Sequence, residues 1–85
     1  MNADELLDQM KHVAEKLNVK VRPELMPVLG GLCTVKGEKV LFLNTALDPW
    51  DQVDVMARAL AQLPIEDVFM APQVRQIIER YKPDL

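Results

Sequence analysis

The stretch Gly30–Asn44, GGLCTVKGEKVLFLN, carries the strongest structural pattern in this chain. It predicts a β-hairpin over residues 31–44, because two runs of strand-forming residues flank a short polar segment. Gly37 supplies the positive φ angle that a tight turn needs. The second strand is apolar on both of its faces, so we expect both faces of the sheet to need cover. The hairpin thus predicts a small α+β core.

The pairing register follows from the choice of turn. If Val35 pairs with Val40, Cys33 lies opposite Phe42 on the same face as the two valines. A slip of one residue would exchange two faces that are almost equally apolar, so the turn must set the register. The residues predicted for the other face are Leu32, Thr34, Leu41 and Leu43.

Further elements surround the hairpin. Apolar residues recur at helical spacing in three segments, and a short alternating segment before the hairpin indicates another strand. Asn2 and Asp48 are suited to cap helix starts, and Pro49 needs no N–H partner as a first helical residue. We therefore predict a single α+β domain over residues 1–85, with a small, mostly antiparallel sheet flanked by helices. The predicted helices lie at about 3–17, 49–63 and 72–82, and the additional strand at 19–22.

Local signals predict how several segments end or connect. Asn18 is a suitable helix stop, and Pro23 is expected to end the strand that precedes it. Residues 24–28 are interpreted as an irregular crossing anchored by Leu25 and Met26. Residues 65–70 fit either a short strand or a loop, and their apolar run Val68-Phe69-Met70 indicates burial.

Composition limits the classes of function. The 85 residues include 10 basic and 13 acidic side chains, which gives a net charge of −3. Nucleic-acid binding is disfavoured, because it needs a basic face that this pattern lacks. The single cysteine fits a reducing compartment. No apolar run approaches the length of a membrane span, and the first residues lack the apolar core of a signal peptide. We expect a soluble, cytoplasmic protein without membrane partners.

Cys33 is the one candidate for catalysis. A nucleophilic thiol needs a base or a positive environment, and nothing in the sequence places the only histidine, His12, near it. The favoured alternative is that Cys33 is a small buried apolar residue on a strand.

The charged clusters have structural interpretations. Asp48, Asp51 and Asp54 resemble an acidic metal cluster, but their position at a helix start explains them better. Arg75 can pair with Glu79 one turn away, which we favour over an anion-binding pocket. We therefore predict no metal site and no cofactor.

The remaining candidates are aromatic. Trp50 lies in the first turn of a predicted helix, and tryptophan is frequent among interface hot spots. We predict a non-catalytic interaction or structural module that binds a protein partner or itself, as a homodimer, near Trp50 and Tyr81. The alternative is a small enzyme or ligand-binding domain that uses Cys33 with Arg22 or Arg58.

Residues 1–63 resemble the small zinc-peptidase domains of the ImmA/IrrE type in the order helix, strand, hairpin, helix. Leu17–Val19 and Val40–Asn44 carry the resemblance. That family places a His-Glu-x-x-His motif on the following helix, where this chain has Arg58–Gln62, RALAQ. The resemblance therefore implies a relative without zinc or peptidase chemistry, and it assigns no functional residue.

Overall fold

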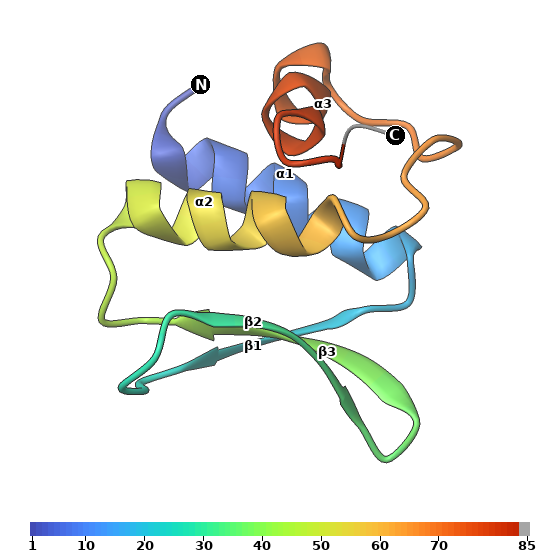
Figure 1. Ribbon diagram of the computed structural model, residues 1–85. Helices are drawn as coiled ribbons and strands as arrows, with labels where there is room; N and C mark the ends of the chain where they lie inside the picture. Colours follow the sequence, from blue (N-terminus) through green and yellow to red (C-terminus); the bar gives the residue numbers. More distant parts are fainter. Residues whose placement is uncertain (84–85) are drawn as a thin grey trace.

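The computed structural model describes residues 1–83 and contains three helices and one three-stranded sheet (Figure 1). The predicted α+β class is confirmed. In chain order the elements are α1 (Ala3–Lys16), β1 (Lys20–Glu24), β2 (Gly30–Val35), β3 (Glu38–Asn44), α2 (Pro49–Leu60) and α3 (Pro72–Glu79).

The sheet is mixed, with the strand order β1-β3-β2. β2 and β3 form the predicted hairpin and run antiparallel, whereas β1 lies parallel to β3 on its other side. β3 is thus the central strand, and β1 and β2 are the two edges of the sheet.

The hairpin turn has only two residues, and this corrects the predicted register. Val35 pairs with Glu38, not with Val40. Lys36 and Gly37 between them both have positive φ angles, 51° and 83°. Two consecutive positive φ angles are the signature of a tight type I′ turn, which matches the twist of the strands. The predicted pairing of Val35 with Val40 would have required a loop of four residues.

The shift of two residues keeps each side chain on its predicted face, because the side-chain period of a strand is two. Cys33 lies opposite Val40, so its predicted pairing with Phe42 is wrong. Leu32 lies opposite Leu41, as the face assignment requires.

The helices cover one face of the sheet, not two. α1 and α2 lie side by side over the sheet, and α3 packs on these two helices without touching a strand (Figure 1). Leu41 and Leu43 project from β3 into the core, where Leu41 is fully buried. The expected cover on both faces is therefore wrong for residues 1–83. The central residues of the core are Met10, Val13, Leu41, Met56, Leu60, Ile65, Val74 and Ile78.

The opposite face of the sheet carries Cys33, Val40 and Phe42. The guanidinium group of Arg22 on β1 lies 5.6 Å from the centre of the Phe42 ring and covers part of this face. The same guanidinium pairs with Glu24 at 3.0 Å. We call this side of the sheet the open face.

Both predicted helix caps are confirmed. The side-chain oxygen of Asn2 accepts a hydrogen bond from the N–H of Glu5 at 2.8 Å, and that of Asp48 accepts one from the N–H of Asp51 at 3.0 Å. Pro49 follows directly as the first helical residue of α2. These contacts satisfy amide groups that have no partner within the helix.

Of the other local predictions, some are confirmed and some are wrong. Asn18 ends α1 with a positive φ of 58°, as expected of a helix stop. Pro23 does not end β1, which continues to Glu24, since an edge strand tolerates a missing N–H on its outer side. Residues 65–70 form no strand. Ile65 is buried, and Val68 and Met70 pack half-buried against the core, so the predicted burial of this run fails only at Phe69, which is 87% exposed.

Candidate interaction surface

Three large apolar side chains are exposed together in the loop between β1 and β2. Leu25, Val28 and Leu29 expose 81%, 62% and 66% of their surface. The prediction that Leu25 anchors this segment is therefore wrong, and the sequence pattern did not single out the other two. The available signal was their place beside Pro27 in a short connection, because connecting segments run over the surface. We call these three residues the apolar patch.

The loop that carries the apolar patch is held in place by Asn44, at the end of β3. Asn44 is a buried polar residue, with 4% exposure. Its side-chain nitrogen donates to the carbonyl oxygen of Val28 at 2.6 Å, and its side-chain oxygen accepts from the N–H of Ala46 at 2.9 Å. One side chain thus connects the loop to the turn before α2. The patch is pre-organised, which lowers the entropy lost on binding.

A groove runs between the start of β2 and α2, next to the apolar patch. It consists of two hollows of about 210 and 360 Å³ that share Leu29, Val55 and Arg58. Gly30 and Gly31 lie on the β2 side without side chains, so the groove reaches the backbone there. The other lining residues are Leu32, Leu47, Asp51, Asp54, Ala59 and Gln62.

One end of the groove is acidic. Asp51 and Asp54 line it beside Leu29 and Leu47. The pKa of Asp51 is raised, mainly because the negative charge of Asp48 lies beside it, and also because Asp48 hydrogen-bonds to it. This crowding of like charges favours a cationic group at this end of the groove.

Tyr81 joins the segment after α3 to the wall of the groove. Its hydroxyl donates to the carboxylate of Asp54 at 2.7 Å, and the guanidinium of Arg58 lies 4.6 Å from the centre of its ring. The hydrogen bond to Asp54 raises the pKa of Tyr81, because ionisation would place two anions together.

This contact predicts the titration of the only tyrosine in the chain. We expect Tyr81 to ionise above its ordinary pKa of 10.0, and Asp54→Asn to lower that pKa. The absorbance of tyrosinate reports the titration directly, and Asp51→Asn serves as the control that leaves it unchanged. The pKa of Tyr81 is higher in the folded chain than in the unfolded chain, so the protonated phenol stabilises the folded state. This stabilisation is fully present at pH values below the unfolded pKa, and it is lost as the pH rises through the folded pKa. Equal titration in wild type and Asp54→Asn would contradict this assignment.

The two predicted interaction residues differ in their surroundings. Trp50, in the first turn of α2, is 57% exposed and precedes the groove residue Asp51. Tyr81 is half-buried by its contacts with Asp54 and Arg58. Trp50 is thus free to contact a partner, whereas Tyr81 helps to fix α3 on α2.

Of the two arginines in the alternative enzyme hypothesis, only Arg22 shares a face of the sheet with Cys33, and it lies on the opposite edge strand. Cys33 is exposed on the open face, so its predicted burial is wrong. Arg58 lies on α2, which covers the other face, and Arg22 is engaged by Phe42 and Glu24. His12 lies 3.9 Å from the carboxylate of Asp8 on α1, a helix that covers the other face of the sheet.

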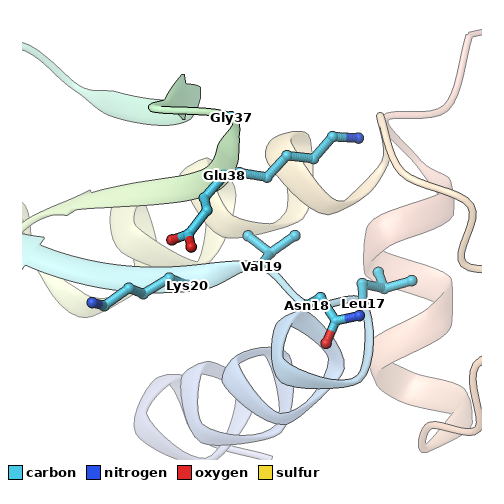
Figure 2. Close-up of a pocket in the computed structure, with 7 residues that line it drawn as sticks. Leu17, Asn18, Val19, Lys20, Gly37 and Glu38 are labelled. Carbon is cyan, nitrogen blue, oxygen red and sulfur yellow. The ribbon is translucent and has the colours of Figure 1, made fainter.

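A larger hollow of about 620 Å³ lies elsewhere, between the turn after α1 and the tip of the hairpin (Figure 2). Leu17–Lys20 form one side and Gly37–Lys39 the other. The carboxylate of Glu38 points toward β1, from which Lys20 extends (Figure 2). Its lining offers neither a thiol nor an imidazole, and we assign it no chemistry.

Neither a metal centre nor a membrane span is present in the described part of the chain. Within residues 1–83, no three histidine, cysteine or acidic side chains are grouped so that they could hold a metal ion. Over the same residues, no helix has the length and apolar character to cross a membrane. No family model, curated protein or solved structure matches the chain. The resemblance to ImmA/IrrE-type domains stays a prediction.

Proposed function

We propose that this chain is a non-catalytic interaction module that associates with a second copy of itself through the apolar patch and the adjoining groove. The observation that carries the proposal is the exposure of Leu25, Val28 and Leu29 on one anchored loop. Exposed apolar side chains gathered in one short segment indicate an interaction site more strongly than single scattered ones do.

The surroundings of the apolar patch support association. The groove beside it offers apolar walls at Leu47 and Val55, into which side chains of a partner can pack. Trp50 extends the surface at the start of α2, and its ring is of the type that dominates interface energies. A small domain buries a lower fraction of its surface than a large one does, and association adds further burial.

We expect wild-type protein to sediment with the mass of two chains at micromolar concentration. Leu29→Ser should weaken the dimer by about tenfold or more, because Leu29 lies at the junction of the patch and both hollows. Sedimentation equilibrium over a range of concentrations measures this dissociation constant.

Phe69→Ser is the matched control, since it removes an apolar side chain that lies outside the apolar patch and is even more exposed, at 87% against 66% for Leu29. It should leave the dimer unchanged. A wild-type mass of one chain at all concentrations, or equal weakening by both variants, would contradict the proposed function.

A further inference from the structure

The two edges of the sheet are protected to different degrees. β1 carries the charged residues Lys20, Arg22 and Glu24 and the proline Pro23, and charges and proline are the usual means of preventing edge-to-edge pairing. β2, GGLCTV, has neither a charge nor a proline along its length. No strand pairs with the outer side of β2 within residues 1–83. The backbone of β2 is thus the unprotected edge.

The groove lies along this same edge. Gly30–Leu32 of β2 form one side of its smaller hollow, and Val55 and Ala59 of α2 form the other. A strand added to β2 would therefore place alternate side chains against a helix surface that carries Val55 and Ala59 together with Arg58 and Gln62.

The two ends of β2 differ in charge. At its start, the groove residues Asp51 and Asp54 lie beside Leu29. At its end, β2 leads into Lys36 in the turn, and β3 begins with Glu38 and Lys39, so the hairpin tip carries two positive charges and one negative charge. An antiparallel second copy would bring this net positive tip of each chain to the acidic start of the other. A symmetric dimer needs this kind of self-complementary surface.

We propose that two copies pair their β2 strands antiparallel, edge to edge, so that one sheet continues through both chains. This inference rests on the proposed self-association and gives it a geometry. The paired edges supply backbone hydrogen bonds, the groove receives side chains of the added strand, and the charged ends fix the direction of pairing.

A charged residue at the middle of β2 tests the pairing. We expect Cys33→Lys to weaken the dimer by about tenfold or more, because two lysines would meet near the two-fold axis. Cys33→Ser is the matched control and should keep the wild-type dissociation constant in sedimentation equilibrium. The side chain of Cys33 is exposed on the open face, so both variants should retain the wild-type circular dichroism spectrum.

Cross-linking of the wild-type protein tests the pairing of the β2 strands without any substitution. Cys33 is the only cysteine and lies near the midpoint of β2, so antiparallel pairing brings the two thiols close together on one face. A short bismaleimide should join two wild-type chains at dilute concentration, and it should join few Leu29→Ser chains.

The outcomes separate this inference from the proposed function. A dimer that survives Cys33→Lys and resists cross-linking overturns β2 pairing but leaves self-association standing. A wild-type mass of one chain at every concentration overturns both. Loss of the dimer in Cys33→Lys but not in Cys33→Ser, with cross-linking of the wild type, supports the paired edges.

Discussion

Gly30→Ala is expected to lower the free energy of unfolding by about 3 kcal/mol or more, which approaches the stability of a marginal small domain. A Cβ atom at Gly30 would lie 2.4 Å from the carbonyl oxygen of Phe42, far inside any contact that real Cβ atoms make. Gly30 also has a φ of +100°, which L side chains rarely adopt. Phe42 belongs to the central strand β3, so its backbone cannot yield without disturbing the pairing on both sides.

Gly37→Ala separates the cost of the positive φ angle from the cost of the steric clash with Phe42. Gly37 has a φ of +83°, but no atom lies within 4 Å of the position that a Cβ atom would take, so this variant loses only the backbone preference. We expect a decrease of about 1–2 kcal/mol for it. Urea denaturation followed by circular dichroism compares the variants at equal slope. Equal losses for both glycines would show that the close approach to Phe42 does not constrain the fold.

Several local features could be predicted from short stretches of sequence. The caps at Asn2 and Asp48 and the helix stop at Asn18 depend on neighbouring backbone groups, and all three are confirmed. The hairpin was also predicted, but its register was not, because lysine rarely takes the positive φ that Lys36 adopts. The placement of all helices on one face depends on packing between distant segments, which the apolar pattern of β3 does not reveal.

The candidate surface was harder to predict because long-range contacts create it. Arg75 lies outside this surface, but it shows the difference between a contact that helical spacing predicts and contacts that only the fold creates. Its predicted pair with Glu79 is present at 3.7 Å. Its guanidinium also donates to the carbonyl oxygens of Ile65, at 3.3 and 3.4 Å, and of Val68 at 2.5 Å, which no helical spacing reveals. In the same way, the exposure of Leu29 follows from where its loop lies in space and not from its apolar character.

Leu41→Ala is expected to lower the free energy of unfolding by about 2–5 kcal/mol. Leu41 is fully buried at the centre of β3, where the sheet meets the helices that cover it. Packed helices cannot collapse into the space that the lost side chain leaves, so a cavity adds to the lost burial. Urea denaturation at a fixed protein concentration measures the change.

Phe42→Ala is the matched comparison on the open face. It removes a larger side chain than Leu41→Ala, yet we expect a loss of only about 1–2 kcal/mol, because Phe42 is half-buried and water already reaches its face. Pairing through β2 edges would leave this face open in the dimer as well. The loss should therefore not depend on protein concentration. A loss as large as that of Leu41→Ala, growing with concentration, would mean that a second copy covers the face of the sheet. The dimer would then be stacked face to face and not joined at its edges.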